Sequence, residues 1–195
     1  MSLIGSTNEE KTWNYLKAKG LPDCGIAGLM GNLYAESCLV PTNLQNSYEK
    51  ALSFTDAAYT AAVDNGTYQN FVKDSAGYGL AQWTYWSRKK KGKSIGDLEM
   101  QLDFLWNELQ GYTVVISTLK TAKTVRAASD SVLLNFERPA DQSDAAKARR
   151  AGFGKKFYDK YATDSTAQKG VSGVSKCYAS AVVAVAIGEL GYVEK

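Results

Sequence analysis

The sequence contains no histidine, and this absence excludes more functions than any other feature of its composition. Without an imidazole, the 195 residues form neither a Ser-His nor a Cys-His nucleophile pair, and they form no His-ligated zinc site. Any proton chemistry within this stretch therefore has to use carboxylates, tyrosine, lysine or cysteine. We expect neither a metal nor a cofactor.

Cysteine is scarce, and long apolar runs are missing. The three cysteines, Cys24, Cys38 and Cys177, are an odd number without metal-type spacing. We expect small buried thiols, although Cys24 and Cys38 would meet if their segments folded back on each other. Residues 1–10 have neither the basic residues nor the apolar core of a secretory signal, and no run reaches the ~20 apolar residues of a membrane span. We therefore expect a protein made in a cytosol, with no signal peptide and no membrane span.

The net charge of +3 is far from the balance typical of nucleic-acid-binding proteins, so we expect no nucleic-acid partner. One basic cluster, Arg88 to Lys91 with Lys93, follows Tyr85 and Trp86. It is interpreted as a solvated helix end, and the alternative is a contact with an anionic polymer. The sequence makes no prediction about oligomeric state.

Hydrophobic periodicity predicts a mainly α-helical domain. The first helix is expected from a cap at Ser6 or Thr7 to Gly20, and the second from a cap at Asp23 to about Ser37. A polar loop is expected over 41–53. The further helices are expected at 55–64, along the stripe 98–109, along the stripe of Val114, Val115 and Leu119, at 125–136 after a Thr124 cap, and at 143–161.

The composition changes after residue 162. Residues 163–176 are rich in Ser, Thr, Gly and Lys, as in a linker, and residues 177–195 turn abruptly apolar. The sequence thus predicts a domain at 1–162, a linker at 163–176, and the first helix of a truncated second domain at 177–195. The alternative is that the last helix docks back on the first domain.

Glu36 is the first candidate for chemistry. It lies seven residues beyond Leu29 and three beyond Leu33, on the apolar stripe near the end of its helix. Desolvation penalises an ionised carboxylate, and a carboxylic acid that keeps its proton can donate it to a glycosidic oxygen. The alternative is a buried glutamate neutralised by a nearby arginine or by backbone donors.

The second candidate is the segment 77–84, which reads Gly-Tyr-Gly-Leu-Ala-Gln-Trp-Thr. It lies in an aromatic, glycine-punctuated stretch that is typical of irregular backbone or a short hairpin. Gly79 permits a close approach of the backbone, and Gln82 offers both a donor and an acceptor. Tyr78 and Trp83 offer flat faces with a polar edge that suit sugar rings. The alternative is an aromatic hairpin of the core.

Together these segments resemble a known family. Residues 28–37 (Gly-Leu-Met-Gly-Asn-Leu-Tyr-Ala-Glu-Ser), followed by Leu39 and Pro41-Thr42-Asn43, are similar to the catalytic-glutamate segment of the phage tail lysozyme family. Residues 77–83 match in the right order, as do 135–140 (Asn-Phe-Glu-Arg-Pro-Ala) with the helix from Arg149/Arg150 to Tyr161 behind them. The family belongs to the lysozyme-like superfamily, with goose-type lysozymes and soluble lytic transglycosylases. The resemblance spans about residues 8–162.

The resemblance implies a helical lysozyme-like fold with a short irregular or β segment lining the cleft. It implies a muramidase that cleaves the β-1,4 bond between N-acetylmuramic acid and N-acetylglucosamine of peptidoglycan. By position, Glu36 is the general acid, and Tyr78, Gly79, Gln82 and Trp83 bind the glycan. The protein would act in a phage virion tail or, once released, on the bacterial cell wall.

The second catalytic group has three candidates, Asp64, Asp74 and Glu137. Inverting glycosidases hold a base about 6.5–9.5 Å from the acid, and retaining ones a nucleophile at about 5–5.5 Å. Asp74 is favoured because it lies three residues before the Gly-Tyr-Gly turn. Asp64 is interpreted as the end of a helix, and Glu137 as an ion-pair anchor of a helix end beside Arg138.

Alternatives remain for the function as a whole. A lytic transglycosylase would act on the same bond without water, and a non-catalytic wall-binding module would bind peptidoglycan through its basic and aromatic residues. Residues 182–194 resemble the opening helix of a CHAP-like amidase or endopeptidase domain.

Overall fold

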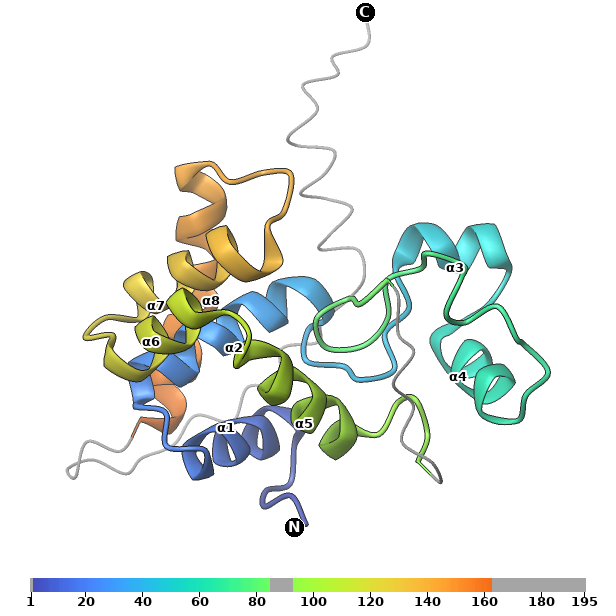
Figure 1. Cartoon of the computed structure of the whole chain (residues 1–195), viewed down its shortest axis with the longest axis horizontal. Coiled ribbons are helices and arrows are strands. Elements are labelled where there is room, and N and C mark those ends of the chain that lie inside the picture. Colours follow the sequence, from blue (N-terminus) through green and yellow to red (C-terminus); the bar gives the residue numbers. More distant parts are fainter. Residues whose placement is uncertain (1, 85–92, 163–195) are drawn as a thin grey trace, which may run out of the picture. The chain divides into compact units, whose positions relative to one another are not determined.

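The structure is a computed structural model that describes residues 2–84 and 93–162 (Figure 1). Within this part, the chain forms eight α-helices and one π-helical segment, and its β-structure is limited to isolated bridges that pair Tyr78 with Leu44 and with Trp83. The predicted mainly α fold is confirmed. The chain divides into two units after Ala162. The predictions for 85–91, for the linker and for 177–195 lie outside the described residues.

Side-chain caps define the starts of most helices. Oxygens of Thr7, Thr55, Asp97, Thr124 and Ser143 each accept a hydrogen bond from the backbone N–H three residues later. The caps predicted at Thr7 and Thr124 are thereby confirmed. The helices are α1 (Asn8–Ala18), α2 (Asp23–Ser37), α3 (Asn46–Leu52), α4 (Asp56–Asp64), α5 (Leu98–Leu109), α6 (Thr113–Thr121), α7 (Val125–Val132), the π-helix η1 (Leu133–Glu137) and α8 (Asp144–Tyr161).

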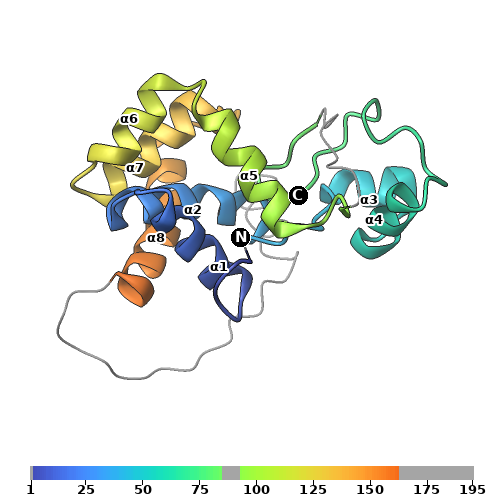
Figure 2. The ribbon, with the colours of Figure 1, turned by 60° about the horizontal axis from the view of Figure 1, so that its bottom comes forward.

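Helix α2 is the centre of the first hydrophobic core. It packs against α1, α6, α7 and α8 (Figures 1 and 2). Residues 25–33 are all buried. Glycines at every third position let its neighbours approach closely. A Cβ on Gly28 would lie 2.4 Å from the Ala128 side chain, and one on Gly31 would lie 2.4 Å from the carbonyl oxygen of Arg150. The tight α2–α8 contact brings Arg150 beside the last turns of α2.

A second, smaller core contains residues of α3 and α4 and of the irregular chain at 65–84 and 93–97. Its largest buried members are Tyr59 and Tyr78, and α3 and α4 lie together away from α6–α8 (Figures 1 and 2). Helix α5 joins the two cores, because Met100 belongs to the second and Leu102 to the first. Trp83 packs against both.

Four local expectations need correction. The polar loop expected over 41–53 contains α3, whose residues Tyr48 and Leu52 pack on the second core. Asp23 is the first residue of α2, and the position before it is held by Pro22 without a side-chain cap. Val114 is 62% exposed, because the buried face of α6 uses Ile116 instead. The helix expected to run to Phe136 widens into η1 from Leu133 onward.

Among the described residues, we looked for a disulfide between Cys24 and Cys38 and for a helix able to span a membrane. Cys24 and Cys38 form no disulfide with each other, and both are half-buried, so the expectation of buried thiols is only partly met. In the part of the chain that the structure describes, none of the helices combines the length and apolar character needed to cross a bilayer.

Candidate active site

The end of α2 places Glu36 where the chain leaves the first core. Its side chain is 21% exposed, which agrees with the predicted position on the buried stripe near the helix end. The next residue, Ser37, donates a hydrogen bond from Oγ to the carbonyl oxygen of Leu80, at 2.8 Å. Cys38 and Leu39 then adopt left-handed backbone conformations (φ 52° and 58°), which turn the chain sharply away. This hydrogen bond therefore joins the end of α2 to the 77–83 segment.

An arginine engages Glu36. Nη2 of Arg150, on α8, lies 2.6 Å from Oε1 of Glu36, and the arginine side chain is only 8% exposed. Nη1 of Arg150 donates to Oδ1 of Asn32, one turn earlier on α2, at 3.4 Å. Asn32 is itself fixed by hydrogen bonds from its Nδ2 to the carbonyl oxygens of Gly28 and Ser129. Glu36 therefore does pair with an arginine, as the alternative interpretation of this residue predicted.

A second carboxyl, Glu137, belongs to the same group. It ends the π-helix η1, and the following Arg138 has a left-handed backbone (φ 48°). Burial raises the pKa of Glu137 well above its usual range, and the Glu36 carboxylate raises it further. The positive charge of Arg150 opposes this effect, and Glu108 adds to it. Helices α2, α5, α8 and η1 therefore bring three carboxyls and one guanidinium within electrostatic reach of one another.

Two polar atoms in this group are buried without a hydrogen-bond partner, Oε1 of Glu137 and Nε of Arg150. One is an acceptor and the other a donor. Buried polar atoms are nearly always paired, so an unpaired one calls for an explanation. The interpretation of Glu137 as an ion-pair anchor of the helix end does not fit this geometry.

The 77–83 segment is held by buried amides. Gln101, fully buried on α5, accepts from the backbone N–H of Leu80 at 2.9 Å and donates from Nε2 to the carbonyl oxygens of Ile95 and Pro41. Gly79 has φ 79° and its missing Cβ would lie 2.7 Å from Oε1 of Gln101, so the glycine is required on two counts. The segment is fixed against α5 as well as against α2.

The four predicted glycan-binding residues differ in accessibility. Tyr78 is fully buried in the second core, and its hydroxyl forms a 2.6 Å hydrogen bond with Oγ1 of Thr60; Gly79 is buried as well. Gln82 and Trp83 are half-buried. Gln82 has a left-handed backbone (φ 48°), and its Nε2 donates to Oδ1 of Asn43 at 2.9 Å. Nε1 of Trp83 donates to Oε2 of Glu108 at 2.8 Å. This hydrogen bond links the segment to the set of acidic side chains that includes Glu36.

The remaining predicted carboxylates make structural contacts. Oδ2 of Asp74 accepts hydrogen bonds from the hydroxyls of Tyr59 (2.7 Å) and Tyr68 (2.8 Å), and its Oδ1 accepts from the backbone N–H of Ala76 (3.0 Å). Asp64 is the last residue of α4, as expected, and accepts from the backbone N–H of Ile95. Asp74 is not among the charged groups that shift the pKa of Glu137. Its hydrogen-bond partners Tyr59 and Tyr68 belong to the second core or pack against it.

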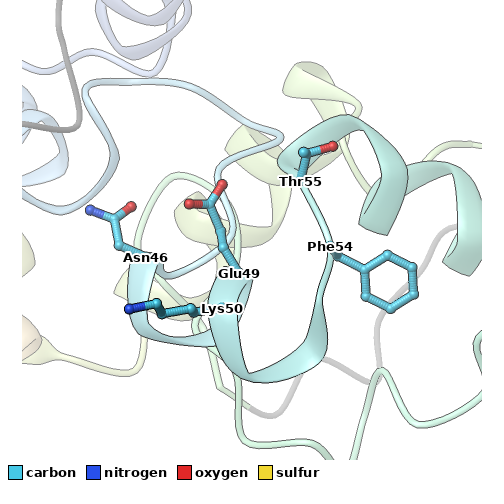
Figure 3. Close-up of a pocket in the computed structure, with 5 residues that line it drawn as sticks. All are labelled: Asn46, Glu49, Lys50, Phe54 and Thr55. Carbon is cyan, nitrogen blue, oxygen red and sulfur yellow. The ribbon is translucent and has the colours of Figure 1, made fainter.

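A surface hollow of about 410 Å³ lies beside α3, lined by Asn46, Glu49, Lys50, Phe54 and Thr55 (Figure 3). None of the predicted site residues lines it. Burial raises the pKa of Glu49, and the neighbouring Asp56 carboxyl raises it further through its charge and a shared hydrogen bond. Burial raises the pKa of Asp56 as well, while the backbone N–H of Leu44 opposes the rise.

Sequence reasoning missed three members of the main site. Asn32 and Arg150 are buried polar residues on helices, and only the glycine spacing of α2 signals that α8 packs against it at this point. Glu108 sits on the half-exposed face of α5 and carries no motif. No group of three or more His, Cys, Asp or Glu side chains within 2–84 and 93–162 has the arrangement of a metal site.

A match to a known protein family covers nearly all of the described residues. Residues 7–161 match the family described as phage tail lysozyme. The chain belongs to the phage tail lysozyme family. The matched range contains the Glu36 segment, the 77–83 segment, η1 and Arg150, so the resemblance drawn from the sequence is confirmed for this part. Membership of the phage tail lysozyme family indicates a cell-wall lytic enzyme that acts on peptidoglycan. The predicted CHAP-like segment lies outside the described residues.

Proposed function

We propose that the chain is a muramidase in which Glu36 donates a proton to the glycosidic oxygen between N-acetylmuramic acid and N-acetylglucosamine. The observation that carries this proposal is the junction at the end of α2. There Glu36 pairs with the buried Arg150, and the neighbouring Ser37 is hydrogen-bonded to Leu80 of the segment that contains Gln82 and Trp83. Trp83 is in turn hydrogen-bonded to Glu108, whose charge acts on Glu137. A glycosidase needs a carboxyl beside the surface that holds the sugar chain, and this is the chemistry that the group supports.

The partly exposed Gln82 and Trp83 are the proposed contacts with the glycan. Nε1 of Trp83 is already bonded to Glu108, so a sugar would meet the indole face and the amide of Gln82. Tyr78 and Gly79 are buried, so they would not touch the glycan and would instead fix the backbone conformation of the segment. Asp74, the sequence-based candidate for the second catalytic group, is not part of this proposal, because two tyrosine hydroxyls and a backbone N–H engage both of its carboxylate oxygens.

The same arrangement also fits a lytic transglycosylase, because a single carboxylic acid serves as proton donor in both reactions. The two enzymes differ in product. A hydrolase leaves a reducing muramic acid end, and a transglycosylase leaves a 1,6-anhydro end.

Mass spectrometry of purified peptidoglycan digested by the full chain tests the proposal. We expect soluble muropeptides with reducing muramic acid ends, and none from the Glu36→Gln variant. Anhydro ends that disappear in the same variant would assign the transglycosylase reaction instead. If neither protein releases fragments, although both sediment with peptidoglycan, the chain is a wall-binding module. Binding alone does not discriminate, since it should survive the substitution under every hypothesis.

A further inference from the structure

The Glu36–Arg150 pair raises a chemical difficulty for an acid catalyst. A general acid has to carry its proton before it can donate it, whereas a guanidinium binds the ionised form of a carboxylate. In the free protein Arg150 holds Oε1 of Glu36 at 2.6 Å. Before the bond is cleaved, Glu36 therefore has to be released from the arginine and has to receive a proton, either from solvent or from another group nearby.

Glu137 has the properties that this task requires. Its Oε1 is buried without a partner, in the same group as the equally unpartnered Nε of Arg150. An acceptor and a donor that are both unpaired, on side chains that interact electrostatically, are complementary. Burial of the carboxyl also raises the pKa of Glu137, which favours its protonated form.

We propose, on the basis of the function proposed above, that Glu137 is a positioning residue that exchanges its proton for Arg150. In the exchange, the O–H bond of Glu137 breaks and an O–H bond forms on Glu36. The guanidinium of Arg150 leaves Glu36 and binds the new Glu137 carboxylate. One proton and one guanidinium change places, so the net charge of the three groups does not change, and Glu36 becomes a neutral acid.

The geometry around η1 favours such an exchange. A π-helical turn is a rare feature that is frequent at functional sites, and here it ends at Glu137 itself. The charges that act on Glu137 come from α2 (Glu36), α8 (Arg150) and α5 (Glu108). Helices α6 and α7 also pack against η1, but Lys120 of α6 is exposed, and Arg126 and Asp130 of α7 pair with each other at 2.7 Å.

The deciding variant is Glu137→Gln in the full chain. Glutamine keeps the size and the neutral charge of a protonated glutamate, so a purely structural role predicts a wild-type rate. The exchange predicts that muropeptide release at pH 7 falls about tenfold or more, with unchanged sedimentation on peptidoglycan. It also predicts that the alkaline limb of the rate profile moves to lower pH, because Glu36 then has to take its proton from solvent.

Two controls keep the outcomes distinct. Glu137→Asp retains an ionisable carboxyl and should keep the wild-type alkaline limb even if its rate is reduced. Asp159→Asn removes an exposed carboxylate that pairs with Lys155 at 2.7 Å, and should behave as wild type throughout. If Glu137→Gln fails to fold, a Glu137→Asp profile shifted to lower pH would equally overturn the proposal.

The two proposals fail separately. A wild-type rate in Glu137→Gln, with an inactive Glu36→Gln, overturns the exchange and leaves Glu36 as the acid. A wild-type rate in Glu36→Gln removes the proposed function, and the exchange with it.

Discussion

Two groups of acidic side chains in this protein have opposite surroundings. Around Asp74, two tyrosine hydroxyls and one backbone N–H occupy both carboxylate oxygens. Around Glu36 and Glu137, an acceptor atom and a donor atom are buried without a partner, and a π-helical turn replaces regular α-helix. The first group is saturated with hydrogen bonds, and the second is not.

The difference indicates which group is built for chemistry. A fully satisfied buried network rigidifies the structure around it, whereas unpaired buried groups and unusual backbone cost stability and tend to persist at functional sites. We therefore expect substitutions around Asp74 to act mainly on stability, and those around Glu36 to act mainly on the rate of lysis.

The largest expected effect on stability comes from the helix contact that places Arg150. In Gly31→Ala the new methyl would meet the carbonyl oxygen of Arg150 at 2.4 Å and the backbone nitrogen of Gly154 at 2.6 Å. Because neither backbone atom can move alone, we expect the free energy of unfolding to fall by about 3 kcal/mol, together with a loss of lysis. Urea denaturation of the purified chain measures the first effect.

Gly152→Ala is the matched control, since it lies on α8 with nothing within 4 Å of its missing Cβ. A helical alanine there should raise stability by about 0.5–1 kcal/mol and leave lysis unchanged. Equal stability losses in the two variants would contradict the close approach of α2 and α8.

Asp74→Asn is expected to have a smaller effect. An asparagine retains one acceptor oxygen, so at least one of the three donors on Asp74 loses its carboxylate partner. We expect a loss of about 2 kcal/mol in the free energy of unfolding. Asp159→Asn, which breaks only an exposed ion pair, should stay within about 0.5 kcal/mol of wild type. If the Asp74→Asn protein is as stable as that control, the hydrogen bonds around Asp74 do not stabilise the fold, and the contrast between the two groups is wrong.

The smallest expected effect is alkaline destabilisation of the second core. Burial, with the Asp74 hydrogen bond and charge, raises the pKa of Tyr68 to about 12 and also raises the pKa of Tyr59. A raised pKa means that the folded state holds the proton more tightly, so this contribution is complete below about pH 10 and is lost as the pH rises through 12.

Melting temperatures between pH 9 and 12 measure this contribution. Tyr68→Phe lacks the titrating hydroxyl, so its melting temperature should fall less over the interval of about pH 10 to 12 than that of wild type. Parallel curves would show that the phenol–carboxylate contact does not shift the proton equilibrium.

The sequence predicted the helices that have strong periodicity and clear caps, because both signals are local. It missed α3, which is seven residues long and depends on Tyr48 and Leu52 packing against a core assembled from distant segments. It also missed η1, because no composition distinguishes a π-turn from the end of an α-helix.

The candidate site was predictable in part for the same reason. Glu36 and the 77–83 segment carry motifs, so their resemblance to the phage tail lysozyme family identified them. The partner of Glu36 depends on which residue of α8 faces the end of α2, and a single sequence does not encode that register in any short pattern. The raised pKa of Glu137 depends on burial between several elements, which is again a property of the assembled fold.

The rates of muropeptide release by Glu36→Gln and Asp74→Asn, each per folded molecule at pH 7, test the central claim most directly. The account predicts a loss of about 10²–10⁴-fold for Glu36→Gln, because the proton donor is removed, and a rate within about threefold of wild type for Asp74→Asn. A large loss in Asp74→Asn at unchanged stability would make Asp74 the second catalytic group that the sequence favoured. A wild-type rate in Glu36→Gln would contradict the account.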